Sequence, residues 1–248
     1  MMSTAMQKLQ TALDTGIADQ LAAEAAMQIS GKKVRALMLQ AAVKNPKVAE
    51  CDTGSVVMAA RQILTWGLEP DGIHAAIVPY GSKAQAQPMV QGLVQLAIKS
   101  GLVSSIRARI VHENDHFEHA EGLHPRIDHV PTMTSPGNPI AVYAIAEMTN
   151  GGQHWEVMTV SDVEAIRKTS RSGNSGPWKD NWAEMAKKNV GRRLCKYLPK
   201  QSTSLQEAIE ADDAQETIEI QTEPTTQNIV EDRRMKALKA ADDNAAKQ

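Results

Sequence analysis

The residues His112-Glu113-Asn114-Asp115-His116 match the pattern H-E-x-x-H, in which a helix brings two histidines to one zinc ion and the glutamate acts as a general base. The preceding residues alternate as in a strand, and Asn114-Asp115 is typical of a turn, so the histidines are not expected one helical turn apart. Five of the seven histidines lie between positions 112 and 129, which leaves adventitious binding of a divalent metal as an alternative. Exposed polar residues on strands and turns are the simpler interpretation, and we assign no metal site and no catalytic residue.

A second group of side chains combines positive charge with aromatic rings. Arg167, Lys168 and Arg171 border a segment with two glycines, whose backbone N–H groups can turn toward an anion. Trp178 and Trp182 follow at i, i+4 spacing. Cations beside aromatic rings favour single-stranded nucleic acid, because a single strand exposes its base faces as well as its phosphates. The alternative is that both tryptophans pack in the core and the cations are only solvated.

Residues 180–198 predict an amphipathic helix that Pro199 ends. The apolar face is expected to carry Ala183, Ala186, Val190, Leu194 and Tyr197. Lys188, Arg192 and Lys196 recur at i, i+4 and i+8 on another face. This spacing predicts a cationic ridge that contacts phosphates, with a plain solvated face as the alternative.

The elements that must position these side chains form a mixed pattern. Helices are predicted at 5–44, at 53–66 with Thr53 as cap, at 92–100, and at 161–169 from a Ser161-Asp162-Val163-Glu164 capping box. Extended segments are predicted at 73–79, 89–90, 105–112, 140–148 and 154–159, the last two joined by a hairpin at Asn150-Gly151-Gly152. On the strand 105–112, Arg107 and Arg109 share one face. The fold class is therefore α+β, with helices and a small antiparallel sheet.

The composition excludes several classes of protein. The chain of 248 residues is 42% hydrophobic, yet it has no run of 18 apolar residues and no long apolar N-terminal segment. We therefore expect a soluble, cytoplasmic protein without a membrane span. Cys51 and Cys195 are expected to stay reduced as structural thiols. No G-x-x-x-x-G-K-[ST] segment occurs, which argues against a nucleotide-driven motor.

Charge divides the chain unevenly. Residues 1–200 carry 22 Lys and Arg against 18 Asp and Glu, whereas residues 201–248 carry 5 against 11. Few strong core residues precede Val34. We therefore expect a mobile helical segment at 1–30, a basic core at 31–200, and an acidic, largely disordered tail at 201–248.

Several sequence blocks between about Asn45 and Pro199 form a further pattern. They include Leu68-Glu69-Pro70, Val78-Pro79-Tyr80-Gly81, Arg107-Ala108-Arg109-Ile110-Val111, Trp155-Glu156-Val157-Met158-Thr159, Gly176-Pro177-Trp178 and Trp182-Ala183-Glu184-Met185-Ala186-Lys187-Lys188. In their order and spacing, these blocks resemble the RecT family of phage single-strand annealing recombinases. Two departures stand out. Met89-Val90-Gln91-Gly92-Leu93 replaces Gly-Tyr-Arg-Gly-Leu of relatives, and Ile98-Lys99 keeps one cation of an arginine pair.

The resemblance implies a protein, not an enzyme, that binds single-stranded DNA and anneals complementary strands without ATP in phage-type homologous recombination. It implies rings or helical filaments in the bacterial cytoplasm, with a phage exonuclease and the host single-strand-binding protein as partners. No nucleotide cofactor is expected, and magnesium is left open. A single-strand-binding protein that does not anneal is the alternative, and a metal-dependent hydrolase is a third class. The expected DNA-binding residues of the 31–200 core are Arg107, Arg109, Lys168, Arg171, Trp178, Lys187, Lys188, Arg192, Arg193 and Lys196.

Overall fold

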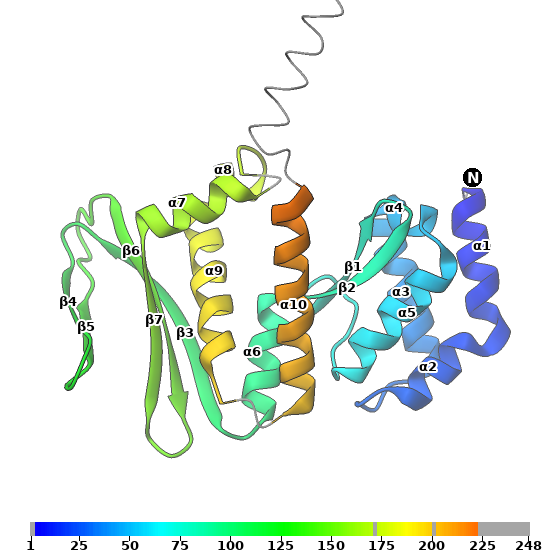
Figure 1. Ribbon diagram of the computed structural model, residues 1–248, viewed down its shortest axis with the longest axis horizontal. Coiled ribbons are helices and arrows are strands. Elements are labelled where there is room, and N and C mark those ends of the chain that lie inside the picture. Colours follow the sequence, from blue (N-terminus) through cyan, green and yellow to red (C-terminus); the bar gives the residue numbers. More distant parts are fainter. Residues whose placement is uncertain (1–2, 171–172, 200–201, 223–248) are drawn as a thin grey trace, which may run out of the picture. The chain divides into compact units, whose positions relative to one another are not determined.

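The computed structural model describes residues 3–170, 173–199 and 202–222. Within these described residues, one compact unit ends at Asp212, and Asp213 begins a second. The first unit contains the helices and strands that position the candidate site (Figure 1). None of the helices in the described part of the chain combines the length and the apolar character that a bilayer span requires.

The first half of this unit is mainly helical. Its helices are α1 (Thr4–Ala12), the π-helical turn η1 (Leu13–Ile17), α2 (Ala18–Glu24), α3 (Gly31–Lys44), α4 (Pro46–Glu50) and α5 (Thr53–Thr65). Leu9, Leu13 and Leu21 are each at most 2% exposed and belong to the main core. The expectation of few core residues before Val34 is therefore wrong, because a stripe of leucines packs this segment onto its neighbours.

A short hairpin, β1 (Ala75–Tyr80) and β2 (Lys83–Pro88), follows and packs on α5. The extended segment predicted at 89–90 is confirmed at Met89 and wrong at Val90, because Val90 already begins helix α6 (Val90–Lys99). Gly92 in the first turn of α6 lies so close to the His74 carbonyl oxygen that an added Cβ would be 2.0 Å from it. The start of α6 is therefore held tightly against the segment before β1.

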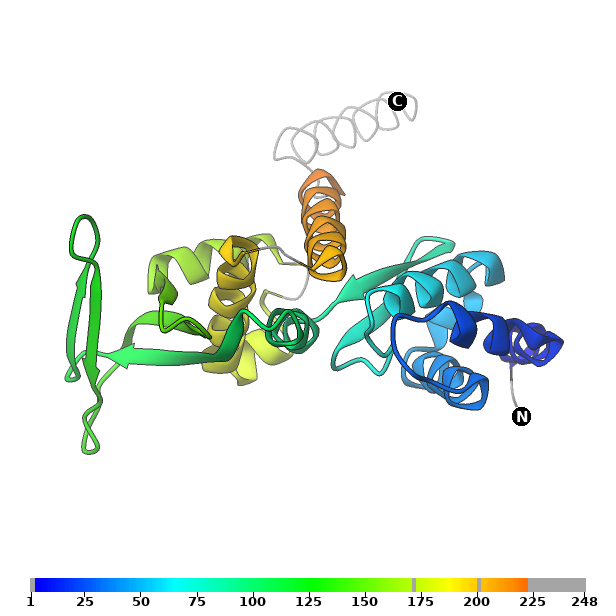
Figure 2. The ribbon, with the colours of Figure 1, turned by 90° about the horizontal axis from the view of Figure 1, so that it is seen from below.

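The second half contains an antiparallel sheet in the order β3-β6-β7, formed by β3 (Val103–His112), β6 (Pro139–Met148) and β7 (Gln153–Thr159). The hairpin predicted at Asn150-Gly151-Gly152 joins β6 to β7 and is confirmed. A separate two-stranded hairpin, β4 (His116–Ala120) and β5 (Arg126–Val130), runs across the end of this sheet (Figure 2).

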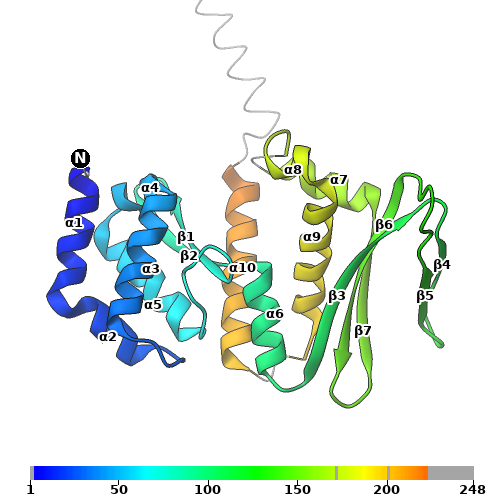
Figure 3. The same cartoon turned by 180° about the vertical axis from the view of Figure 1, so that it is seen from behind.

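The remaining helices are α7 (Val160–Thr169), α8 (Pro177–Asp180), α9 (Trp182–Tyr197) and α10 (Thr203–Thr222). Helix α9 covers one face of the β3-β6-β7 sheet, and α6 packs on the side of α9 that points away from the sheet (Figure 3). The capping box of α7 is formed by Thr159 and Asp162, two residues earlier than predicted. Asp52 rather than Thr53 caps α5.

The mixed helical and antiparallel-sheet class is confirmed. The acidic tail differs from the prediction where it is described, because residues 203–222 form α10 instead of a disordered segment. Leu205, Ala208 and Ile209 are at most 1% exposed and extend the core beyond the boundary expected at 200. Residues 223–248, the rest of the expected tail, lie outside the described residues.

Candidate nucleic-acid interface

Helix α9 has one broad buried face and one face with polar and charged residues. Its buried residues are Ala186, Val190, Gly191, Leu194 and Cys195. Two residues assigned to the apolar face by the sequence are not buried: Ala183 is exposed, and Tyr197 is 64% exposed. The buried face is rotated from the predicted one because α9 packs on α6 as well as on the sheet.

The polar face of α9 borders a cavity of about 400 Å³. Met185, Lys188, Asn189 and Arg192 line it, and their spacing of i, i+3, i+4 and i+7 places them on one side of the helix. The opposite wall is formed by Gly72, Ile73, Met89, Val90 and Gln91, from the segment before β1 and the start of α6. The predicted ridge thus lies beside a concave site.

Carboxylates of the same chain already hold several of the predicted DNA-binding cations. The pairs are Lys187 with Glu184, Arg192 Nε with Asp212 Oδ2 at 3.3 Å, and Arg193 Nε with Glu156 Oε2 at 3.0 Å. Asp212 is 1% exposed and comes from α10. A phosphate must therefore compete with internal carboxylates for these cations.

The remaining cations differ in accessibility. Lys188 on α9 and Lys168 at the end of α7 are exposed. Neither forms an ion pair with any residue that the structure describes. Lys196 is half-buried in the last turn of α9. Arg171 lies outside the described residues. Lys188 is therefore the ridge cation that is most available to a ligand.

Arg107 and Arg109 lie on the face of the sheet opposite to α9. Ile106, Ala108 and Ile110, which alternate with them, pack on the core that contains α9. Arg107 pairs with Glu147 of β6. The two arginines border a hollow of about 190 Å³ with Tyr143 and Ile145. The fold therefore places these two arginines and the α9 ridge on different surfaces, although the sequence grouped them in one set of expected DNA-binding residues.

The tryptophans predicted to stack on bases are structural in this conformation. Trp178 is 2% exposed and packs in the core, so its ring face is covered, as in the alternative considered from the sequence. The indole of Trp182 donates from Nε1 to Glu164 Oε1 at 2.8 Å and thereby ties α9 to α7.

A third tryptophan, Trp155 on β7, was missed by sequence reasoning. It is half-buried and stands in register with Ile145, which in turn pairs with Arg107 across β6 and β3. Its position on the alternating strand 154–159 is the sequence signal that could have predicted which face of the sheet it occupies.

The H-E-x-x-H residues lie on a strand, a turn and a strand, as predicted, because β3 ends at His112 and β4 begins at His116. Asp115 in the turn accepts hydrogen bonds from the backbone N–H groups of Thr132 at 2.7 Å and His112 at 2.8 Å. These bonds, and a contact to His129 Nε2 at 3.1 Å, hold the pKa of Asp115 well below its usual range. The segment thus fixes the base of the β4–β5 hairpin. Three or more His, Cys, Asp or Glu side chains do not converge on a metal-sized site anywhere in the described residues.

Both cysteines are buried thiols. Burial raises the pKa of Cys195 to about 12, so the nucleophilic thiolate is scarce near neutral pH. Burial also raises the pKa of Cys51.

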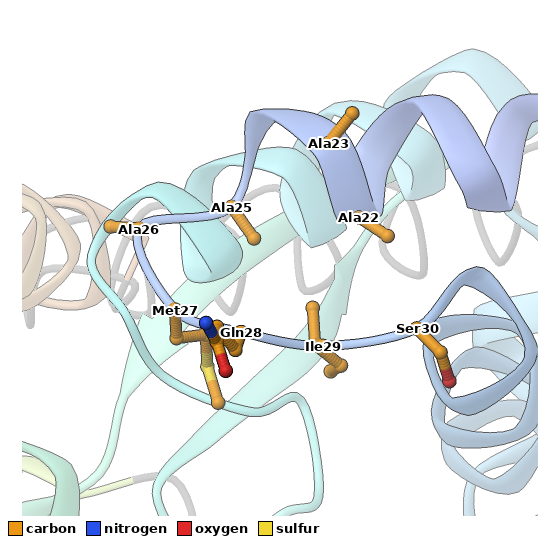
Figure 4. A pocket seen from close by; sticks show the side chains of 8 residues that line it. All are labelled: Ala22, Ala23, Ala25, Ala26, Met27, Gln28, Ile29 and Ser30. Carbon is orange, nitrogen blue, oxygen red and sulfur yellow. The ribbon is translucent and has the colours of Figure 1, made fainter.

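A larger surface hollow, of about 880 Å³, lies at the loop between α2 and α3 (Figure 4). The eight described residues that line it are Ala22, Ala23, Ala25, Ala26, Met27, Gln28, Ile29 and Ser30. Because none of these side chains is charged, this lining offers a phosphate no cation, unlike the cavity beside α9.

The fold and the cationic face of α9 define a mixed helical and antiparallel-sheet protein with the chemistry to bind a polyanion. A sequence profile described as the RecT family matches residues 32–226. Protein RecT of Escherichia coli (strain K12) is 37% identical over 205 residues, which are 79% of this chain and 76% of that protein. The uncharacterized protein YqaK of Bacillus subtilis (strain 168) is 30% identical over 186 residues, which are 73% of this chain and 64% of that protein.

The chain therefore belongs to the RecT family, and the resemblance found in the sequence is confirmed. Membership supports DNA binding and recombination-related annealing of single strands as the general role.

Proposed function

We propose that this protein binds single-stranded DNA and anneals complementary strands without ATP, as an oligomer, in phage-type homologous recombination in the bacterial cytoplasm. The observation that carries the proposal is the polar face of α9, where Lys188 and Arg192 border a cavity together with amide and apolar side chains. Family membership supports the same role. The ring or filament form, a phage exonuclease and a host single-strand-binding protein as partners are parts of the proposal.

The physical problem in annealing is that two polyanions must approach each other while their bases stay free to pair. Lysine and arginine side chains neutralise phosphates and release counterions, which lowers the repulsion without reading the sequence. On α9, Arg192 and Arg193 exchange an internal carboxylate for a phosphate, so the cost of breaking each pair partly offsets the new contact. No covalent bond changes in this scheme, and we assign no catalytic residue, no nucleotide and no magnesium ligand.

The ridge is tested by the double substitution Lys188→Ala and Arg192→Ala. We expect weaker binding of single-stranded DNA and a salt dependence whose logarithmic slope falls by about 1.4, the value for two lost phosphate contacts on a single strand. The matched control is Lys8→Ala with Lys32→Ala, which removes the same charge from exposed positions on α1 and α3. Equal affinity and slope in the folded ridge variant would remove α9 from the interface.

Annealing itself is tested by mixing complementary labelled strands with the protein in the absence of nucleotide. The proposal expects faster duplex formation than in buffer. A protein that binds the strands and does not accelerate pairing is the non-annealing alternative. Electron microscopy with and without complementary oligonucleotides then tests the oligomeric form, and particles that remain monomeric in both samples would contradict it.

A further inference from the structure

The cavity beside α9 is lined by apolar and amide side chains as well as by cations, and binding of phosphates requires only the cations. One part is apolar and consists of Ile73, Met89, Val90 and Met185. The other part consists of the amides Gln91 and Asn189 and the cations Lys188 and Arg192. A volume of about 400 Å³ lies within the usual range for sites that hold a small molecule.

The walls of the cavity are held in place by close packing. At Gly92, directly after Gln91, the α6 backbone rests against the His74 carbonyl, and there is no room for a side chain. On α9, Asn189 Nδ2 donates to the Met185 carbonyl oxygen at 2.7 Å, which fixes the amide on the lining face. The cavity is therefore preformed rather than a gap between loosely held helices.

The lining matches the parts of a nucleotide. Aliphatic and thioether side chains provide apolar surface for a flat ring, and methionine sulfur makes favourable contacts with aromatic systems. Amide side chains offer both donors and acceptors to the edge of a base. At the rim, Lys188 and Arg192 carry the charge that a phosphate needs, beside the first turn of α6, which no side chain caps.

We propose that this cavity takes one unstacked base of a bound single strand, with the adjoining phosphate at Lys188 and Arg192. The inference rests on the proposed function, because it describes a subsite of the same DNA interface. The nine described lining residues include no aromatic ring, so the base is held by aliphatic and thioether contacts and not by stacking on tryptophan or tyrosine. The protein then contacts the strand through a base as well as through its phosphates.

The test compares an oligothymidylate with an oligomer of the same length and phosphate number that consists of abasic sites. We expect the wild-type protein to bind the base-bearing strand about fivefold or more tightly, as for the loss of one modest base contact. Met185→Ala should reduce this preference, whereas Lys188→Gln should weaken binding of both strands by the same factor. Ile73→Ala is the second cavity variant, because Ile73 is 57% exposed and contributes little to the core. Met58→Ala, at a 57% exposed position on α5, is the methionine control and should leave the preference unchanged.

The possible failures are distinct. If the wild-type protein binds neither strand, the proposed function fails. If it binds both strands equally, the function stands and the base subsite is overturned. If Met185→Ala and Ile73→Ala both fold and keep the full wild-type preference, the base contact exists elsewhere and this cavity is not its site.

Discussion

Asp115 lies within the residues that match the H-E-x-x-H pattern of a zinc site, and its carboxylate holds the turn between β3 and β4 in place. Its side chain is 1% exposed and accepts hydrogen bonds from the backbone of Thr132 and His112. The same oxygen that contacts His129 accepts from His112, and His129 in turn lies 3.0 Å from the Tyr143 hydroxyl through Nδ1. The negative charge of Asp115 is therefore used to join the turn, β5 and β6.

The low pKa of Asp115 predicts a particular dependence of stability on pH. Because its pKa is lower in the folded state than the ordinary value of about 3.9, the carboxylate stabilises the fold above that value. This contribution is lost as the pH falls below the ordinary value toward the folded-state pKa. Asp115→Asn should therefore be less stable than wild type at pH 7, and it should lose less stability than wild type between pH 6 and pH 3.

Urea unfolding midpoints at these pH values measure the effect. Asp128→Asn is the matched control, because Asp128 is an exposed aspartate on the same hairpin. Parallel pH profiles for wild type and Asp115→Asn would show that the carboxylate does not stabilise the hairpin base.

For single residues, the sequence predicted the kind of local structure, such as a turn or a helix cap, better than the particular residue that forms it. It predicted a turn at Asn114-Asp115 because short polar side chains favour turns, and the structure has that turn. It chose Thr53 and Ser161 as helix caps, whereas Asp52 and Thr159 cap the helices. A cap depends on which residue leaves the helical region of backbone conformation, and neighbouring polar residues give the same local signal.

At the scale of elements, strong periodicity predicted the strands and helices near the site, including β3, the β6–β7 hairpin and α9. Which face of a helix is buried was harder to predict from the sequence, because burial depends on which elements pack together. Tyr197 is exposed although it continues the apolar stripe, whereas Gly191 and Cys195 are buried. The contact of α9 with α6, which joins residues about 100 positions apart, has no signal in a local pattern.

Helix α10 was not predicted from the sequence, because the acidic composition of residues 201–248 was taken to indicate disorder. Its side chains Leu205, Ala208 and Ile209 follow i, i+3 and i+4 spacing and are buried. Ile209→Ala should therefore lower the free energy of unfolding by about 2–5 kcal/mol, the usual cost of such a truncation in a core. Glu207→Ala, at an exposed position on the same helix, should change it by less than about 0.5 kcal/mol.

Denaturant unfolding of both variants gives the comparison. If Ile209→Ala is as stable as Glu207→Ala, α10 does not pack on the core in solution. The same packing means that truncation near residue 200 removes part of the core, so a deletion that begins after Asp213 is the cleaner test of what the acidic tail does.

At the scale of the whole molecule, the sheet separates two groups of cations that the sequence had combined. Arg107 and Arg109 lie on one face of β3, and α9 with Lys188 and Arg192 lies beyond the other face. Both groups could be predicted from the sequence, because alternation on a strand and a repeat of four residues on a helix are local patterns. Which side of the sheet each group faces is a property of the tertiary fold.

The separation predicts independent contributions to DNA binding. Arg107→Ala with Arg109→Ala, Lys188→Ala with Arg192→Ala, and the fourfold combination should follow additivity, because the two pairs lie beyond opposite faces of the sheet. Arg107 pairs with Glu147 of β6, and Arg192 pairs with Asp212 of α10. The loss of affinity in the fourfold variant should thus equal the product of the two separate losses within about twofold. Titration of a short labelled strand at fixed salt measures the three variants. A combined loss far smaller than the product would mean that both groups of cations hold the same phosphates, which requires the strand to pass around an edge of the sheet or a second copy of the chain to bring the two faces together.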